Sequence, residues 1–220
     1  MKVCATNRSY VAAALCLVVA APALHAQVSE DPTVATAQLL TEVAPVLGWS
    51  QGAPEAAITV VEFSDLSCPY CAEFHGDVRA ELIAEFVESG AVRWITLSYV
   101  AGLYPNSLLA SEAVECAAGQ GAHEPYLDRV YRERDGWLRA PRADALDDLE
   151  RHARDLGLNI EAWHTCRDAP ETRNRIRQIN ALAQDVGVRG TPTWVVDGFP
   201  VMGALPLAYA RSFIERRMLR

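Results

Sequence analysis

Residues 58–71 read ITVVEFSDLSCPYC, and this stretch decides the fold. Its first six residues form a β-branched, mostly apolar run, which predicts a buried strand. A short loop follows over residues 64–67. Cys68 then begins a helix with Pro69 as its first helical residue, a position where the missing N–H of proline costs nothing. The sequence therefore places a CxxC pair at the start of a helix, directly after a strand.

The position of Cys68 predicts a reactive thiol. Its sulfur would face the unpaired N–H groups and the positive end of the helix dipole, which stabilise a thiolate and lower the pKa of a cysteine. Cys71 lies one turn further along the same face of the helix. It is placed to close a small disulfide with Cys68 but not to meet an outside reagent. This arrangement predicts thiol–disulfide exchange.

Other uses of the CxxC pair are weaker interpretations. A structural zinc site needs four ligands; His75 is a candidate third ligand, but no fourth stands close in the sequence. Covalent haem attachment needs His directly after the second Cys, where Ala72 stands. A purely structural disulfide at this spacing stays open. We therefore expect no metal and no cofactor.

The order of elements predicts an α/β fold. A second strand is expected over residues 92–98, which gives a βαβ unit with a parallel strand pair. Two short strands joined by an Asp-Gly turn and a closing helix are expected near the C-terminus. Between them lie only helical patterns. This order is that of a thioredoxin-like fold with an inserted helical domain.

We expect the chain to divide into five consecutive parts. They are a signal peptide (1–26), an N-terminal leader (27–55), the first part of the thioredoxin-like domain (56–103), the inserted helical domain (104–186) and the second part of the thioredoxin-like domain (187–220).

The predicted signal peptide has a positive start, an apolar run and a small residue before the cut. The apolar run at 11–23 is shorter than the roughly 20 residues that a spanning helix needs. We expect export to the periplasm, with no membrane anchor after cleavage. The formal net charge of −8 becomes more negative when Lys2 and Arg8 leave with the signal, and an acidic surface argues against a nucleic-acid partner.

The positions of the cysteines indicate two functions, a redox-active pair and a structural disulfide. Cys4 and Cys16 fall in the predicted signal peptide, so the CxxC pair and two distant cysteines, Cys116 and Cys166, remain. An even number of cysteines in an exported chain indicates disulfides. We predict that Cys116 and Cys166 form a structural disulfide between two helices of the insertion. The alternative is two buried free thiols.

Two further positions are candidates for the site. Glu62 is a carboxylate inside an apolar strand, where burial favours the neutral form, so it is placed to move protons to and from Cys71; alternatively, it points to the sheet edge and is solvated. Thr191–Pro192 precedes a strand, where proline is tolerated. Composition alone makes it an ordinary turn, whereas a cis bond there would be kept for a purpose.

The stretches at 61–71 (VEFSDLSCPYC) and 187–194 (GVRGTPTW), with the helical block between them, resemble the DsbA-like thiol–disulfide oxidoreductases. The similarity covers roughly residues 47–218. It implies that Cys68 is the nucleophile, Cys71 the resolving thiol, Glu62 the buried acid and Pro192 a cis-proline beside them.

The resemblance also implies partners. Thr191 would offer its backbone to a substrate strand, and Pro69 and Tyr70 would lie beside it. The substrates would be exported proteins with thiols or disulfides, and a membrane redox partner would reset the enzyme.

The resemblance leaves the direction of electron flow open. Tyr70 in the CxxC motif and Thr191 before Pro192 are similar to the residues at these places in the isomerase-type relatives DsbG and DsbC and in ScsC. DsbA itself has Pro-His and Val at these places. We favour dithiol oxidation, since the leader is too short for a dimerisation domain of the isomerase kind, although an oligomerising helix at 34–43 stays open. The alternatives are a disulfide isomerase or reductase of the DsbG or ScsC type, and a non-enzymatic chaperone-like or metal-handling module.

Overall fold

The computed structural model describes residues 32–219, so the predicted signal peptide at 1–26 lies outside the described residues. The described strands form one five-stranded sheet in the order β1-β3-β2-β4-β5. These strands are β1 (Trp49–Gln51), β2 (Ile58–Ser64), β3 (Val92–Ser98), β4 (Thr193–Val196) and β5 (Phe199–Met202). Only β2 and β3 are parallel, as the strand–helix–strand order predicts.

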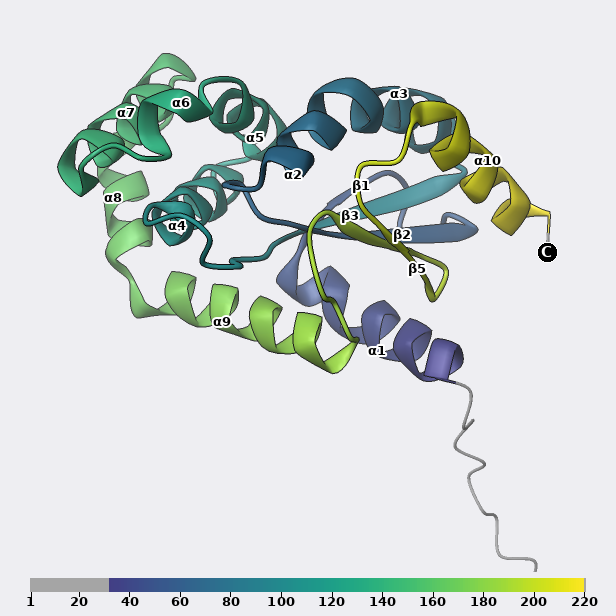
Figure 1. Cartoon of the computed structure of the whole chain (residues 1–220). Coiled ribbons are helices and arrows are strands. Elements are labelled where there is room, and N and C mark those ends of the chain that lie inside the picture. Colours follow the sequence, from purple (N-terminus) through teal and green to yellow (C-terminus); the bar gives the residue numbers. More distant parts are fainter. Residues whose placement is uncertain (1–31, 220) are drawn as a thin grey trace, which may run out of the picture.

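Helices cover both faces of this sheet (Figure 1). The face with α1 (Pro32–Leu47) and α9 (Pro170–Asp185) buries Val61 and Phe63 from β2. The opposite face, covered by the helix after Cys68 and by α10 (Leu207–Met218), buries Val60. Successive side chains of a strand point to opposite faces. Glu62 and Ser64 therefore share the face that lies under the CxxC helix.

The helix after Cys68 runs through four consecutive segments. They are α2 (Pro69–Phe74), the π-helical η1 (His75–Arg79), α3 (Ala80–Leu82) and the π-helical η2 (Ile83–Val87). The residues at the junctions keep right-handed helical dihedrals, so the axis is continuous. Single π turns inside α-helices occur often at functional sites. Here η1 carries His75 and Arg79, which both face the helical block.

The helical block lies between β3 and β4 and packs at one end of the sheet (Figure 1). Its remaining helices are α4 (Ser107–Ala118), α5 (His123–Arg132), α6 (Arg134–Trp137), α7 (Arg142–Asp155) and α8 (Ile160–Asp168). Their apolar core includes Cys68 and Cys71. The CxxC pair therefore sits at the junction between the sheet and the block. The α/β, thioredoxin-like fold class with a helical insertion is confirmed.

Two features of the leader differ from the expectation. The helix α1 continues past Pro45, although a proline inside a helix usually breaks it, because Leu40, Ala44 and Leu47 are buried against the sheet. The edge strand β1 was not predicted. It has three residues and no β-branched side chain, and it pairs with β3 in antiparallel register.

Candidate active site

Cys68 has the geometry of a helix N-cap. Its backbone is extended (φ −74°, ψ 126°), and Pro69 occupies the first helical turn. The Cys68 N–H donates to the Asp65 carbonyl at 3.0 Å, which closes the loop after β2. Only 3% of Cys68 is exposed, and Cys71 is fully buried. Both cysteines are free thiols.

The two thiols have opposite pKa shifts. A hydrogen bond from the Cys71 thiol is the largest cause that lowers the pKa of Cys68 to about 6; burial opposes it, while Thr191 and the N–H groups of Cys71 and Tyr70 add to it. Burial raises the pKa of Cys71, and the hydrogen bond to Cys68 and the charge of Cys68 raise it further. The helix N-terminus therefore contributes as expected, but the neighbouring thiol contributes more. These opposite shifts favour a thiolate at Cys68 and a protonated thiol at Cys71.

The loop before β4 meets Cys68 directly. The Thr191–Pro192 peptide bond is cis. The Cys68 thiol donates to the carbonyl oxygen of Thr191 at 3.3 Å. Further hydrogen bonds hold this loop, from Thr193 Oγ1 to the Gly190 carbonyl at 2.7 Å and from the Gly203 N–H to the Pro192 carbonyl at 2.8 Å. The two motifs singled out in the sequence thus meet at one sulfur atom.

Glu62 is buried on the sheet face under the CxxC helix, with 2% of its surface exposed. The alternative of a solvated carboxylate at the sheet edge is therefore wrong. Its Oε2 accepts from Arg79 Nε at 3.0 Å and from Trp94 Nε1 at 2.8 Å. Its Oε1 accepts from the Ser64 hydroxyl. The ion pair with Arg79 and the two further hydrogen bonds fix the position of the Glu62 side chain under the CxxC helix.

Arg79 continues the charge network into the helical block. Its guanidinium pairs with Glu124 of α5 at 2.8 Å and donates to Gln51 of β1 at 2.9 Å. Glu124 also contacts His123 at 2.8 Å. An open hollow between η1 and α5, lined by His75, Arg79 and Glu124 among others, meets the network at its outer end. The buried carboxylate is thus linked to the molecular surface.

Two residues that the sequence did not reveal hold the loop before Cys68. Asp65 Oδ1 accepts from the Ser67 N–H at 2.8 Å and from the Ser107 hydroxyl at 2.8 Å, and Oδ2 accepts from the Ala101 N–H at 2.7 Å. Arg134 of α6 donates to the Ser67 carbonyl at 2.5 Å. An Asp two residues before a Ser is a recognisable turn signal. Nothing in the sequence marks Arg134.

Of the other predicted residues, Tyr70 lies near the two thiols, and Cys116 and Cys166 lie in the helical block. Tyr70 is 62% exposed beside the CxxC pair, where an incoming chain would meet it. Cys116 of α4 and Cys166 of α8 form the expected disulfide, with 50 residues between them in sequence. It joins two helices of the helical block.

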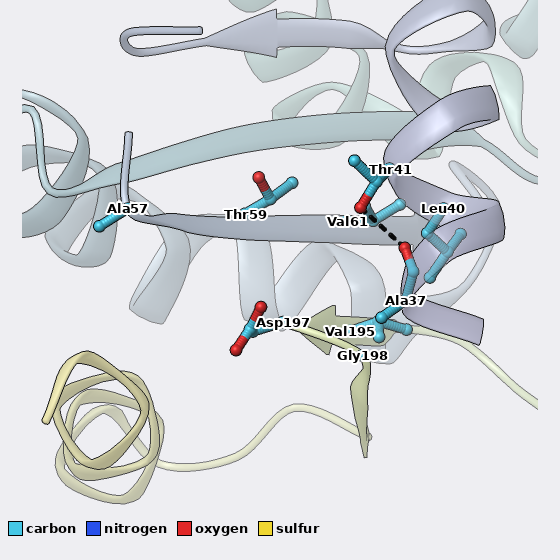
Figure 2. A pocket seen from close by; sticks show the side chains of 9 residues that line it. All are labelled: Ala37, Leu40, Thr41, Ala57, Thr59, Val61, Val195, Asp197 and Gly198. Atoms are coloured by element: carbon cyan, nitrogen blue, oxygen red, sulfur yellow. Dashed lines mark hydrogen bonds between the residues drawn. The ribbon is translucent and has the colours of Figure 1, made fainter. Parts of the chain in front are cut away.

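Residues 32–219 contain no group of three or more His, Cys, Asp or Glu side chains arranged to hold a metal ion. A small pocket does lie under α1 at the opposite end of the sheet, and Thr41 there donates to the Ala37 carbonyl at 2.8 Å (Figure 2). Apart from Asp197 its lining is uncharged, and it holds none of the predicted site residues.

This fold and this pair of thiols have the arrangement that thiol–disulfide exchange requires. Residues 46–216 match the family described as Thioredoxin. The chain therefore belongs to the thioredoxin family. The predicted resemblance is confirmed at the level of the thioredoxin family.

Named relatives and solved structures agree with this assignment. The chain is 28% identical to a thioredoxin-like oxidoreductase from Silicibacter pomeroyi, with a TM-score of 0.64, over 79% of this chain and 94% of that one. It superposes on alpha-DsbA1 of Wolbachia pipientis with a TM-score of 0.68 at 21% identity, over 78% and 90% of the two chains. It is 24% identical to a putative protein-disulfide oxidoreductase of Rickettsia bellii, over 80% of this chain and 67% of that protein.

A different relative is much longer. The chain is 32% identical over 203 residues to the Na(+)/H(+) antiporter NhaA 3 of Salinispora tropica, which covers 90% of this chain and only 30% of the antiporter. The chain thus spans less than a third of that relative's length.

Proposed function

We propose that this chain is a periplasmic oxidant that introduces disulfides into exported proteins through a Cys68–Cys71 redox disulfide. The observation that carries the proposal is the lowered pKa of Cys68, about 6, beside a buried Cys71 that stays protonated. A stabilised thiolate is a good leaving group, and it stabilises the reduced form of the enzyme. Both effects favour electron flow from substrate to enzyme.

The oxidation proceeds in two exchanges. A substrate thiolate attacks the Cys68 sulfur of the oxidised enzyme, and the Cys68–Cys71 bond breaks as the substrate–Cys68 bond forms. Cys71 leaves with the electron pair and takes a proton. A second substrate thiolate then attacks the substrate sulfur of the mixed disulfide, and Cys68 leaves as a thiolate. The substrate has lost two electrons, and the enzyme is a dithiol.

Thr191 supports a substrate position beside Cys68. Its carbonyl accepts the thiol hydrogen bond in the reduced protein. When Cys68 is a thiolate or a disulfide that bond is absent, which frees the carbonyl for the N–H of an extended substrate chain. Pro69 and the exposed Tyr70 would lie next to the same chain.

The leader supports an oxidant more than an isomerase of the dimeric kind. The helix α1 buries Leu40, Ala44 and Leu47 against its own sheet and against α9. Its apolar side is therefore used within the chain, which argues against an oligomerising helix at 34–43. Tyr70 and Thr191 still favour the second candidate function, a disulfide isomerase.

The cellular setting follows from the proposed export. A membrane redox partner would return the reduced enzyme to the disulfide form. No helix within residues 32–219 is long and apolar enough to cross a membrane. Ion transport, the activity named for the antiporter relative, belongs to a protein of which this chain matches 30%, and we do not propose it here.

Two assays with the purified protein test the proposal. The oxidised protein should convert a reduced dithiol peptide to its disulfide in a reaction that needs Cys68, and light scattering should show a monomer. A dimer or trimer that reactivates scrambled ribonuclease but oxidises the peptide slowly would favour the isomerase. A protein without turnover in either assay would instead be the non-enzymatic, chaperone-like or metal-handling module that the sequence analysis left open.

A further inference from the structure

Ser67, the residue directly before Cys68, has all of its polar groups bonded to two charged side chains. Its N–H and its hydroxyl donate to Asp65 Oδ1 at 2.8 and 2.6 Å. Its carbonyl accepts from Arg134 Nη2 at 2.5 Å. Ser67 itself is fully buried. A carboxylate therefore binds this residue through its donors, and a guanidinium cation binds it through its acceptor.

We propose that Arg134 is a positioning residue whose guanidinium charge, held on the Ser67 carbonyl, stabilises the Cys68 thiolate. This inference rests on the proposed function, and it gives the inserted helical block a part in the chemistry. In the second exchange of the proposed oxidation, a substrate thiolate bonds to the substrate sulfur of the mixed disulfide, the bond to Cys68 breaks, and Cys68 takes the electron pair. A cation near that sulfur favours this step and the reduced enzyme that it forms.

Covalent geometry keeps the cation near the sulfur. The carbonyl that Arg134 binds belongs to the peptide bond between Ser67 and Cys68, so the guanidinium lies within roughly 10 Å of the Cys68 sulfur. Salt screens exposed charges over about the same distance. Arg134 is half-buried and its Nε is enclosed, so its charge is screened less than that of a surface arginine.

Arg134 pairs directly with no carboxylate among residues 32–219, and its buried Nε has no hydrogen-bond partner there. An arginine two positions earlier is different, because Arg132 pairs with Asp128 at 2.8 Å on the exposed side of α5. A partly buried charge without a counter-charge costs free energy. The Cys68 thiolate supplies a negative charge near this cation in the reduced enzyme.

The short helix α6 fixes the backbone from which Arg134 extends. Trp137 of α6 is fully buried, and its Nε1 donates to the Val130 carbonyl at 2.9 Å. Asn106 donates to the Trp137 carbonyl at 2.7 Å and to the Ala140 carbonyl at 2.9 Å. The end of α6 therefore cannot move without the loss of buried hydrogen bonds.

The residue after Asn106 ties α6 to the loop before Cys68. Ser107 begins α4, and its hydroxyl donates to Asp65 Oδ1 at 2.8 Å. Asp65 is fully buried, and its Oδ2 accepts from the Ala101 N–H at 2.7 Å. The helix α6, the start of α4 and this loop are thus linked by buried hydrogen bonds. Such a linked unit holds a charge at a fixed distance from the sulfur, as electrostatic stabilisation requires.

Three elements bring charged or titratable groups to Cys68. They are the preceding loop with Asp65, α2 with Cys71, and α6 with Arg134. The Asp65 carboxylate disfavours a nearby thiolate, whereas the Cys71 thiol favours one through its hydrogen bond. Arg134 carries the positive charge of this set. Removal of that charge should therefore have an effect that the Cys71 hydrogen bond does not replace.

Two substitutions in the purified protein test the inference. Arg134→Gln removes the charge but keeps an N–H donor, whereas Arg134→Lys keeps both. The rate of iodoacetamide alkylation of Cys68 is measured over a series of pH values. In Arg134→Gln the midpoint should rise, so that the rate near the wild-type midpoint of about 6 falls about threefold or more. Arg134→Lys should stay within about twofold of wild type, because it keeps the charge.

The equilibrium with glutathione gives a second readout. Loss of the cation destabilises the reduced protein, so the equilibrium constant that favours the dithiol at neutral pH should fall about threefold or more in Arg134→Gln. A loss of packing elsewhere in the block would not shift the alkylation midpoint and this constant together. If Arg134→Gln does not fold, Arg134→Met takes its place, because methionine is also uncharged and fills part of the same space.

Arg132→Gln is the matched control. It removes an exposed arginine, paired with Asp128 on α5, and should leave both readouts at their wild-type values. A wild-type midpoint of about 6 that Arg134→Gln and Arg134→Met leave unchanged would overturn this inference alone. Equal losses in Arg134→Gln and Arg134→Lys would also overturn it, because the charge would then have no effect. A wild-type midpoint above about 8 would overturn the proposed function and this inference together.

Discussion

The Cys68 sulfur lies 3.3 Å from the carbonyl oxygen of Thr191, a residue 123 positions further along the chain. This contact joins the CxxC helix to the cis-proline loop. It places the Cys68 sulfur beside the Thr191 backbone, where we propose that an extended substrate chain pairs. One hydrogen bond thus joins the predicted reactive thiol to the loop that we propose to position the substrate.

The reactivity of Cys68 should follow its lowered pKa. The rate of alkylation of the reduced protein should rise with pH around a midpoint of about 6, with labelling at Cys68 and none at Cys71. Peptide mapping after iodoacetamide at several pH values measures both. A midpoint above 8, or equal labelling of the two cysteines, would contradict the assignment of the nucleophile.

Cys71 should act on Cys68 through its hydrogen bond. In Cys71→Ala the largest cause that lowers the pKa of Cys68 is removed, so the alkylation midpoint should move upward. The variant should also accumulate mixed disulfides with substrates, because no thiol remains to resolve them. An unchanged midpoint would show that the helix N-terminus alone stabilises the thiolate.

The Arg79–Glu124 pair should make the free energy of unfolding depend on pH in the acidic range. Burial raises the pKa of Glu124, but the His123 hydrogen bond and the Arg79 charge outweigh it and lower the pKa to about 2. A carboxyl with a lowered folded-state pKa adds stability above its ordinary value of 4.5, and that stability is lost as pH falls towards 2. Glu124→Gln should therefore cost about 2 kcal/mol at neutral pH, and less as the medium becomes acidic.

Denaturant unfolding at several pH values measures this difference. The control is Glu85→Gln, which removes an exposed pair with Arg211 and should cost less than about 1 kcal/mol. Equal effects of the two variants, or a Glu124→Gln cost that does not change with pH, would contradict the account of the network.

The Cys116–Cys166 disulfide should stabilise the block without taking part in exchange. It closes a loop of 50 residues, so the double variant Cys116→Ala/Cys166→Ala should lose about 2 to 4 kcal/mol of unfolding free energy. Dithiol oxidation at low temperature should be unchanged, because Cys68 and Cys71 are untouched. Mass mapping that finds a free Cys116 in the non-reduced protein would refute the pairing.

The fold followed from local patterns in the sequence. The β-branched run at 58–63, the Asp197-Gly198 turn and the helical spacing after Cys68 each match the element in the structure. The edge strand β1 could not be predicted, because a strand of three residues without a β-branched side chain leaves no recognisable sequence pattern. The helix α1 could not be predicted to continue past Pro45, because packing of α1 against the sheet outweighs the cost of a proline inside the helix.

The site could be predicted only where its residues carry a local signal. Cys68, Cys71 and Pro192 stand in short motifs with a mechanical reason for their spacing. Arg79 and Glu124 stand on helices whose sequences look like any amphipathic surface. Their roles depend on which strand each helix covers, and only the packed structure shows that.

The reduction potential of the Cys68–Cys71 pair tests the central claim most directly. The purified protein is equilibrated in glutathione buffers of known ratio, and the fraction of dithiol is counted by mass after acid quenching. A Cys68 thiolate stabilised at neutral pH predicts a potential nearer to the roughly −120 mV of a strong oxidant than to the roughly −270 mV of a reductant. A potential close to the reductant's value would contradict the proposal that this chain oxidises its substrates.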